Sequence, residues 1–315
     1  MAPAARRRPA SLVSVFDRLT LAEDLLDCRG RVVARRGLVV SPESIEEAAQ
    51  RARPAPRRAL ADTPLAGELE AVLDDPAYRA LFERAGARDA VARAVGAAGL
   101  TEALVEELLA LRDERPALHL HAFTTAAVAV RMLLSAVGGA RALPDLAAAA
   151  LLHDLGMRHV PATLVERADR LEIREAHRIA AHPLLGAYQL ACELGPHPAV
   201  AAARCHHWRC GQGYPGMGAA PSRAVEVVSV ASAFAALTRP RAYRSAAYDA
   251  RGAADVIVAE VLAGHADANT AKLLVHALRG GRGDPRAIRF GGAREGHAPE
   301  VNRHAPVSAP GRSPV

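Results

Sequence analysis

Hydrophobic positions between residues 116 and 279 follow the spacing of buried or amphipathic helices. Ala, Leu and Val dominate this region, and Gly or Pro interrupts it at 138–139, 161 and 195–196. Because Ala and Leu favour helices whereas Gly and Pro end them, the pattern predicts an almost wholly helical region. The predicted helices span 118–137, 143–155, 172–194, 198–205, 224–237, 252–263 and 269–278.

A different pattern precedes this region. Short β-branched runs within residues 12–40 are separated by Arg29-Gly30 and Arg36-Gly37, which predicts two or three short strands joined by glycine turns. Ser41-Pro42-Glu43 then supplies a hydroxyl N-cap, a proline at the first helical position and an acid in the first turn, so a helix is expected to begin there. Residues 66–111 read as further helical segments.

These patterns divide the chain into four parts. We expect a disordered leader at 1–10, a small N-terminal domain of short strands and helices at 11–115, a helical domain at 116–280 and a disordered tail at 281–315. The fold class expected is therefore mainly α, a helical bundle preceded by a small mixed α/β domain.

Composition narrows the classes of function. Half of the residues are hydrophobic, only 3% are aromatic, and the net charge of +6 is carried by arginine, since Lys272 is the only lysine. The arginines are dispersed apart from residues 6–8, and few aromatic rings are present to stack on bases, so nucleic-acid binding is not expected. No uncharged apolar stretch reaches the roughly 18 residues of a spanning helix, and the apolar run at 12–16 is too short for a secretory signal. We expect no membrane partner and a cytoplasmic location.

The four cysteines match no disulfide framework. Cys205 and Cys210 flank two histidines, but their spacing fits no common zinc-ligand pattern. We interpret all four as ordinary free thiols, with a zinc clip at Cys205 and Cys210 as the alternative.

Histidines and one aspartate carry the candidate chemistry. They occur as His153-Asp154 in LLHDLGMRHVP, His182 in IAAHPLLGA and His206-His207 in HHWRCGQGYP. Upstream, LHLHAF offers His121, with His119 two residues away as an alternative. Several neutral imidazoles with a carboxylate that can bridge or balance charge are the donors that first-row transition metals prefer. A buried His-Asp pair also needs a partner for its charge.

The order of these blocks resembles the HD-GYP family, bacterial relatives of the HD phosphohydrolases that linearise cyclic di-GMP. LLHDLGMRHVP is similar to the family's LLHDIGKIGIP, and LEIREAHRIAAHPLLGAYQL resembles its L-x-x-E helix, with Glu175, His182 and Gly186 in register. HHWRCGQGYP resembles HHE-x-x-DGxGYP, and AFAALTRPRAYR resembles FDALTSDRPYR. The resemblance covers about residues 116–263 and implies an HD-type helical bundle.

The resemblance also implies roles for individual residues. His121, His153 and Asp154 would serve one metal, and His182, His206 and His207 would hold a second, with Asp154 as the bridge and catalytic carboxylate. One or two divalent transition-metal ions, iron or manganese, are implied, and water activated there would attack phosphorus. The residues expected to contact the substrate are Arg241, Arg244, Gly213 and Tyr214.

The sequence departs from the family pattern at positions expected to bind metal or substrate. Ser232 stands where the late metal aspartate is expected, Ala235 replaces a second aspartate, and Met157 replaces the lysine used toward substrate phosphate. The loop before Tyr214 is one residue short, lacks its glutamate and has Cys210 in place of aspartate. Glu226, six residues before Ser232, falls on another helix face and is a poor substitute ligand.

Two functions therefore stay open. The first is a metal-dependent phosphodiesterase acting on cyclic di-GMP or a related nucleotide, attenuated by the changes at Ser232 and Met157. The second is a catalytically inactive signalling module that keeps the fold and binds nucleotide or protein partners.

Overall fold

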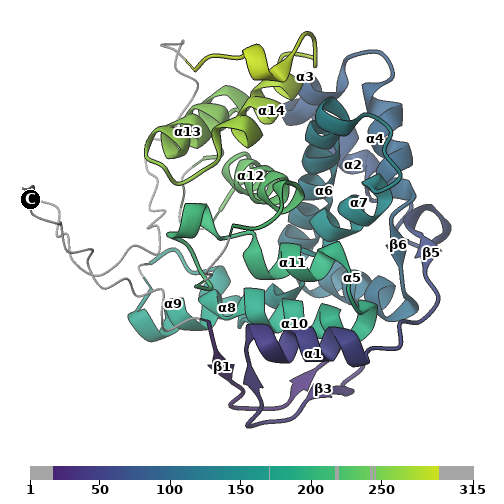
Figure 1. The fold of residues 1–315 in the computed structure, drawn as a ribbon, viewed down its shortest axis with the longest axis vertical. Helices are drawn as coiled ribbons and strands as arrows, with labels where there is room; N and C mark the ends of the chain where they lie inside the picture. The colour runs from purple at the N-terminus through teal and green to yellow at the C-terminus, as the bar shows by residue number, and fades with distance from the viewer. Residues whose placement is uncertain (1–16, 170, 217–219, 242–243, 245, 291–315) are drawn as a thin grey trace, which may run out of the picture.

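The computed structural model describes residues 17–169, 171–216, 220–241, 244 and 246–290 (Figure 1). The predicted leader and residues 291–315 of the predicted tail lie outside these described residues. Helices dominate the fold and a few two- or three-residue strands precede them, which confirms the expected fold class.

Short antiparallel strands open the described chain. They are β1 (Leu19–Thr20), β2 (Leu25–Leu26), β3 (Val32–Ala34) and β4 (Val39–Val40). β1 pairs with β4, and β2 pairs with β3. Helix α1 (Pro42–Arg51) follows, and Ser41 caps it as expected, because its side chain accepts a hydrogen bond from the Ser44 amide in a reciprocal capping box. Figure 1 shows these elements at one end of the molecule, with α1 against α10 (His182–Leu194).

A run of short elements leads into the bundle. They are β5 (Arg58–Ala59), η2 (Leu60–Asp62), α2 (Glu70–Leu73), η3 (Pro76–Tyr78), α3 (Arg79–Phe82), α4 (Ala87–Gly96), β6 (Gly99–Leu100) and α5 (Glu102–Glu114). β5 pairs with β6 in an antiparallel ladder, although about forty residues separate them. Both α4 and α5 pack against α6 (Pro116–Val137), so this run contributes directly to the helical core.

The remaining helices agree closely with the predicted spans. They are α7 (Leu143–Leu152), η4 (Leu155–His159), α8 (Ala162–Val165), α9 (Ile173–Ala180), α10, α11 (Pro198–Cys205), η5 (Arg209–Gly211), α12 (Arg223–Leu237), α13 (Ala250–Leu262) and α14 (Ala268–Leu278). Two differences concern the site. The helix predicted at 143–155 ends at Leu152, and the one predicted at 172–194 is broken into α9 and α10 at Ala181.

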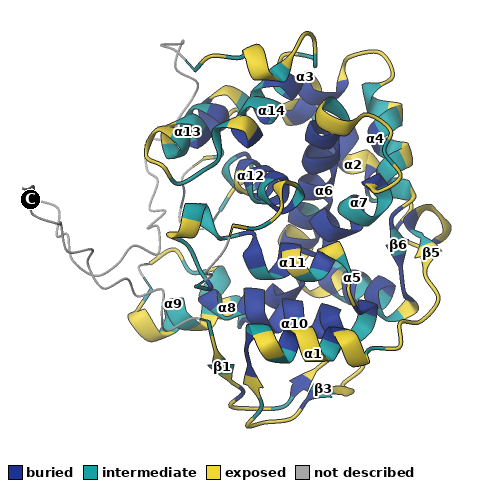
Figure 2. Ribbon diagram, viewed as in Figure 1, coloured by how far each residue is buried: buried dark blue, intermediate teal, exposed yellow. Residues whose placement is uncertain are grey.

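One continuous apolar core holds these elements together, from Leu21 near the first strands to Ala277 in α14. Figure 2 shows the buried positions concentrated along α6, α7 and α10, with exposure confined to outward faces and connections. Helix α6 is long and apolar enough to cross a membrane, yet 72% of its apolar window is buried inside the protein. Its apolar character is therefore explained by its place as a core helix.

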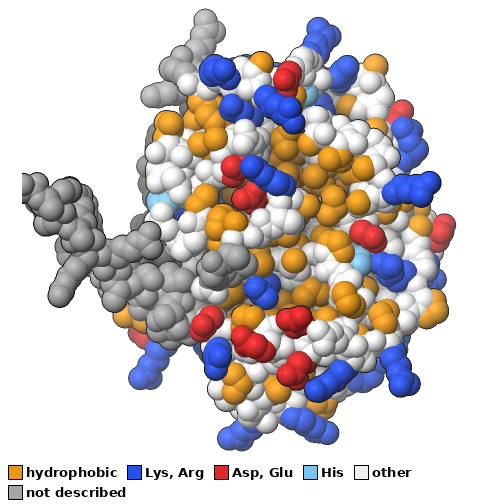
Figure 3. Space-filling model, viewed as in Figure 1, with side chains coloured by type: hydrophobic (Ala, Val, Ile, Leu, Met, Phe, Trp, Pro, Cys, Tyr) orange, Lys and Arg blue, Asp and Glu red, His pale blue; other side chains and the backbone are white. Residues whose placement is uncertain are grey.

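Residues beyond α14 stay close to the bundle as far as they are described. Residues 281–290, the first part of the predicted tail, include η6 (Pro285–Ala287), and Phe290 packs against the core. On the face shown in Figure 3, Lys and Arg side chains are spread around the edge, and apolar side chains occupy much of the centre.

Candidate metal centre

The His-Asp pair lies at the junction between α7 and η4. The buried stretch 147–152 is mostly alanine, so α7 packs closely within the bundle and delivers His153 fully buried at its end. Asp154 follows as the N-cap of η4, and its side chain is 17% exposed. The helix ends at Leu152 rather than Leu155, and the Asp154 carboxylate lies among the histidine rings.

Gly156 allows this turn to pack directly on α10. A Cβ at Gly156 would lie 2.0 Å from the His182 carbonyl oxygen and 2.6 Å from the Gly186 amide nitrogen. Both neighbours are backbone atoms and cannot rotate away. Only glycine permits the approach that places Asp154 beside His182.

A proline orients His182 at the start of α10. Pro183 has no N–H, so it cannot donate to the carbonyl of Ile179, four residues before it, and the helix predicted at 172–194 breaks there. The His182 Nδ1 lies 2.7 Å from that carbonyl oxygen and donates to it. The break therefore has a local cause and fixes the direction of the His182 ring.

Backbone carbonyls set the tautomers of three histidines. The Nδ1 atoms of His153 and His206 lie 2.8 Å from the Ala150 oxygen and 3.0 Å from the Ala203 oxygen, respectively, and His182 makes the equivalent contact. A carbonyl only accepts hydrogen bonds, so each Nδ1 carries the proton. In the neutral rings the Nε2 atoms then present lone pairs, which is the form that binds metals.

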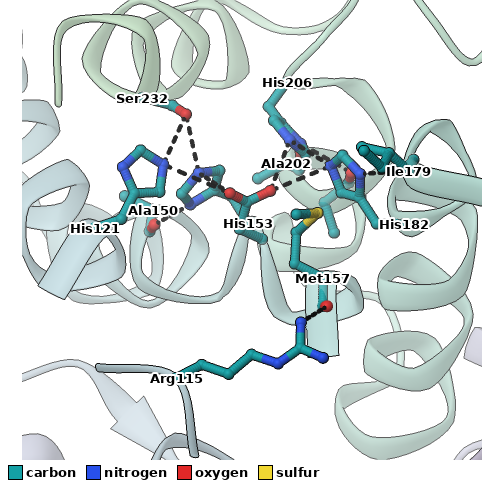
Figure 4. A network of polar contacts seen from close by, with 12 residues as sticks. Arg115, His121, Ala150, His153, Met157, Ile179, His182, Ala202, His206 and Ser232 are labelled. Atoms are coloured by element: carbon teal, nitrogen blue, oxygen red, sulfur yellow. Dashed lines mark hydrogen bonds and ion pairs between the residues drawn. The ribbon is translucent and has the colours of Figure 1, made fainter. Parts of the chain in front are cut away.

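These lone pairs converge on the Asp154 carboxylate. Figure 4 shows the rings of His121, His153, His182 and His206 gathered around one point. Asp154 Oδ1 lies 3.2 Å from the Nε2 atoms of both His182 and His206, which are themselves 3.2 Å apart. Asp154 Oδ2 lies 3.5 Å from His121 Nε2 and 3.6 Å from His153 Nε2. Among the described residues, Oδ1 has no hydrogen-bond donor.

Ring nitrogens that present lone pairs to a carboxylate repel its negative charge, and burial keeps the rings in this neutral form. Burial lowers the pKa of His153 to about 4 and holds the pKa values of His121 and His207 well below the usual range. The Asp154 carboxyl is an ordinary acid group that is ionised at neutral pH when a cation balances its charge. An anionic carboxylate faces neutral nitrogens without intervening protons. A bound cation would resolve the conflict, so the donor set fits a metal.

The donors form two groups that share Asp154. One comprises Asp154, His182, His206 and His207, and the other comprises His121, His153 and Asp154. Within each group the donor atoms lie within 4.8 Å of one another. The grouping agrees with the arrangement implied by the family resemblance, including the place of Asp154 between two positions.

The choice between His119 and His121 is settled by contacts. His119 places Nδ1 3.0 Å from the Leu108 carbonyl oxygen and Nε2 3.2 Å from Glu68 Oε2, away from the cluster. His121 lies two residues further along α6, on nearly the opposite side of the helix, and its Nε2 points toward Ser232 and Asp154. His119 is therefore a packing residue, and His121 belongs to the candidate centre.

Ser232 in α12 lies where the missing carboxylate is expected. Its Oγ is 3.1 Å from His153 Nε2 and 3.3 Å from His121 Nε2. A hydroxyl has one proton and can donate to only one of these nitrogens at a time. Glu226 pairs with Arg223 near the start of α12 and belongs to neither donor group, in agreement with the prediction that it is no substitute.

The loop that follows His206-His207 folds back over the cluster. The Tyr214 ring stacks on His207 with a centroid distance of 4.6 Å and an interplanar angle of 22°. Gly213 makes this possible, because a Cβ there would lie 1.5 Å from the His207 carbonyl oxygen. Cys210 has a left-handed backbone conformation, φ 54°, that aspartate or asparagine adopts more readily.

The two candidate phosphate-binding arginines have different surroundings. Arg244 is buried, and its guanidinium donates to the Ala236 and Arg239 carbonyl oxygens at 2.6 Å each, closing the end of α12. Arg241 is half-buried, and its charge contributes to the low pKa of His121, which places it near the centre. Of the two, Arg241 is better placed to meet an anion, and substrate contact by either stays a prediction.

Two side chains near η4 complete the surroundings. Met157 is buried and directs its sulfur toward the cluster, so it brings no cation to this side (Figure 4). Arg115, which sequence reasoning missed, donates to the Met157 carbonyl oxygen at 2.9 Å and to the Val160 carbonyl oxygen at 2.5 Å. No local pattern marks Arg115, because its partners lie more than forty residues away.

Comparison with known proteins agrees with this geometry. The family model of the HD domain matches residues 103–270, a little more than half of the chain, and the match includes every member of the two donor groups. No curated protein matches the chain. HD domains bind divalent metals, and the described His and Asp cluster is suited to hold one. The chain therefore belongs to the HD domain family of metal-dependent phosphohydrolases.

Proposed function

We propose that the protein is an HD-GYP-like phosphodiesterase for cyclic di-GMP with reduced activity. The observation that carries the proposal is the sharing of Asp154 between two histidine groups. The contact between Tyr214 and His207 adds support for the HD-GYP subfamily, because the Gly-Tyr-Pro loop then borders the metal centre. The family membership supplies the reaction class, and the subfamily motifs suggest the substrate.

The residues present would divide the work unequally. His182, His206 and His207 with Asp154 offer four donors, whereas the other position has His121, His153 and the shared carboxylate. A bound divalent ion, iron or manganese by resemblance to the family, would supply Lewis-acid activation of water and of the phosphate oxygens. Ser232 contributes a neutral hydroxyl instead of a charge, so the position formed by His121, His153 and Asp154 would bind a cation less tightly.

The substrate side is also depleted of charge. Met157 brings no ammonium group toward a phosphate, whereas the charge of Arg241 acts on His121 and lowers its pKa. We propose that Arg241 meets a phosphate of the nucleotide and that Gly213 and Tyr214 border the nucleotide on the loop side. Loss of both a metal carboxylate and a substrate cation would lower turnover more than binding.

The second candidate function is a catalytically inactive signalling module. The replacement of the family's aspartate by Ser232 and of its lysine by Met157 favours this function, because the fold and one four-donor group remain although those two residues are lost. Such a module would bind nucleotide or a signalling protein in the bacterial cytoplasm. The two functions differ in turnover and share the metal centre.

Product analysis separates the two functions. Protein purified anaerobically and loaded with Mn²⁺ or Fe²⁺ is incubated with cyclic di-GMP, and linear products are separated by chromatography. We expect slow hydrolysis that exceeds that of Asp154→Asn, a matched variant without the shared charge. Binding without product above this control would favour the inactive module. Absence of both binding and product would reject cyclic di-GMP as the ligand.

A further inference from the structure

The helical turn η4 determines where the Asp154 carboxylate lies. Asp154 is its N-cap, and the Met157 amide donates to the Asp154 carbonyl oxygen at 2.9 Å. With only five residues, η4 has too few internal hydrogen bonds to hold its own position firmly. Contacts from neighbouring elements must therefore fix it.

A buried carboxylate in α5 makes one of these contacts. Glu107 is 2% exposed, and its Oε2 lies 3.3 Å from Arg158 Nε in η4. Its Oε1 accepts a hydrogen bond of 2.9 Å from Gln189 Nε2 in α10. Gln189 in turn is joined to η4, since its Oε1 lies 2.9 Å from His159 Nε2. Glu107 thus reaches η4 by two routes, one through Arg158 and one through Gln189.

The same carboxylate is tied to the N-terminal strands. Glu107 Oε1 also accepts a hydrogen bond of 2.8 Å from the Cys28 amide, in the turn between β2 and β3. Asp27 shapes this turn, because its Oδ1 accepts from the Arg29 and Arg31 amides at 2.9 and 2.8 Å. A single buried charge therefore connects three elements that are far apart in sequence.

Leu25 and Ala34 pack the β2–β3 strand pair into the core, but the space beside its turn is open. A cavity of about 320 Å³ lies between the β2–β3 turn and helices α5 and α10, and Asp27, Arg31 and Glu107 line it. The turn has a second tie to α5, the solvent-exposed ion pair between Arg29 and Glu106, whose attraction water screens. The hydrogen bond from the Cys28 amide is the tie that reaches the buried carboxylate of Glu107. A buried charge is retained at a cost unless such partners compensate it.

We propose that Glu107 is a positioning residue for the Asp154-bearing turn and couples that turn to the β2–β3 turn of the N-terminal region. It acts through Arg158 and Gln189 and does not touch the metal donors. The inference rests on the proposed metal centre for its functional meaning. Movement of the N-terminal turn, by a partner or a ligand, would thereby change the geometry at Asp154.

Hydrogen–deuterium exchange of the metal-free protein tests the structural half. Glu107→Leu removes the buried charge, and Asp27→Ala loosens the turn without touching α5. We expect η4 amides to exchange at least tenfold faster in both variants, with Glu107→Gln closer to wild type because it keeps the acceptor. The matched control is Asp24→Ala, since Asp24 braces the adjacent turn through Arg35 and Arg36.

Titration with Mn²⁺ alone tests the functional half. We expect Asp27→Ala to weaken Mn²⁺ binding at least tenfold while the unfolding temperature changes no more than in Asp24→Ala. Unchanged η4 exchange in Glu107→Leu and Asp27→Ala would overturn the inference, as would an equal effect of Asp24→Ala. If Glu107→Leu does not fold, Asp27→Ala alone decides. Failure of the wild type to bind Mn²⁺ would reject the proposed metal centre, whereas the exchange data would still judge the coupling.

Discussion

Replacing Ser232 by aspartate should restore the donor that the His121 position lacks. Ser232 Oγ lies 3.1 Å from His153 Nε2 and 3.3 Å from His121 Nε2. An aspartate on the same backbone extends one bond further into the space between these rings, with a charge in place of a hydroxyl. The Ser232→Asp variant is therefore expected to bind metal more tightly than the wild type and to be less stable without it.

The magnitude follows from the surrounding charges. Asp154 Oδ2 already lies 3.5 Å from His121 Nε2, so the new carboxylate would sit about 5 Å from an existing anion. At an effective dielectric constant of about 20 this repulsion is about 3 kcal/mol, and relaxation would leave a loss of about 1–3 kcal/mol in the metal-free free energy of unfolding. A divalent cation reverses the sign. Because even indirect supports of a metal change its affinity by about 10–100-fold, we expect a gain of at least about tenfold.

Calorimetric titration with Mn²⁺ and thermal unfolding with and without the ion measure both effects. Ser232→Asn is the matched control, with nearly the same shape and no charge, and it should gain little affinity. Elemental analysis after anaerobic purification gives the number of ions per chain. Tight binding of two ions by the wild type, unchanged in Ser232→Asp, would refute the reasoning, because the serine would then be no deficit.

Three further predictions follow from the site. Gly156→Ala should lower the free energy of unfolding by about 3 kcal/mol and weaken Mn²⁺ binding, because the new Cβ would lie 2.0 Å from a backbone oxygen of α10. Gly139→Ala is the control in urea titrations and should change little, because open space surrounds Gly139. Without metal, the free energy of unfolding should fall as pH drops from 6.5 toward 4, because His153 stays neutral in the folded protein but takes up a proton when the chain unfolds. The pKa of about 4 for His153 corresponds to a loss of about 3 kcal/mol. Urea titrations in the presence of a chelator measure this loss, and a flat pH profile would contradict it. Arg241→Ala should weaken cyclic di-GMP binding about tenfold at unchanged stability, whereas Arg244→Ala should lower stability by about 2 kcal/mol, and calorimetry with thermal unfolding would expose the opposite pattern.

Several elements could be predicted from the sequence because their signals are local. Ser41 and Pro42 mark the start of α1, and α11 has the predicted bounds because Pro198 and the following small residues define it. Hydrophobic periodicity likewise located α6, α12 and α14 to within two residues. The histidine motifs also predicted side chains that the structure brings together, and their role as metal ligands stays a prediction.

The break before His182 shows where sequence reading failed although the cause was local. Pro183 was present in the sequence, but strong helical periodicity on both sides suggested one helix. Periodicity reports which positions are buried, and it is insensitive to a change of direction between two buried helices. The proline's missing N–H leaves the Ile179 carbonyl oxygen to His182 instead.

Only the tertiary structure shows which histidine of α6 lies at the candidate metal centre and which residues hold the neighbouring backbone in place. His119 and His121 are equivalent as sequence, and only the packing of α6 against α12 brings His121 to Ser232. The contacts of Arg115 and Glu107 join residues separated by about forty to eighty positions, and the β5–β6 pair is similar. Such contacts depend on how whole helices pack, and no short stretch of sequence contains that information. The sequence by itself determined the helices and the ligand types, while packing determined how Asp154 is shared and held.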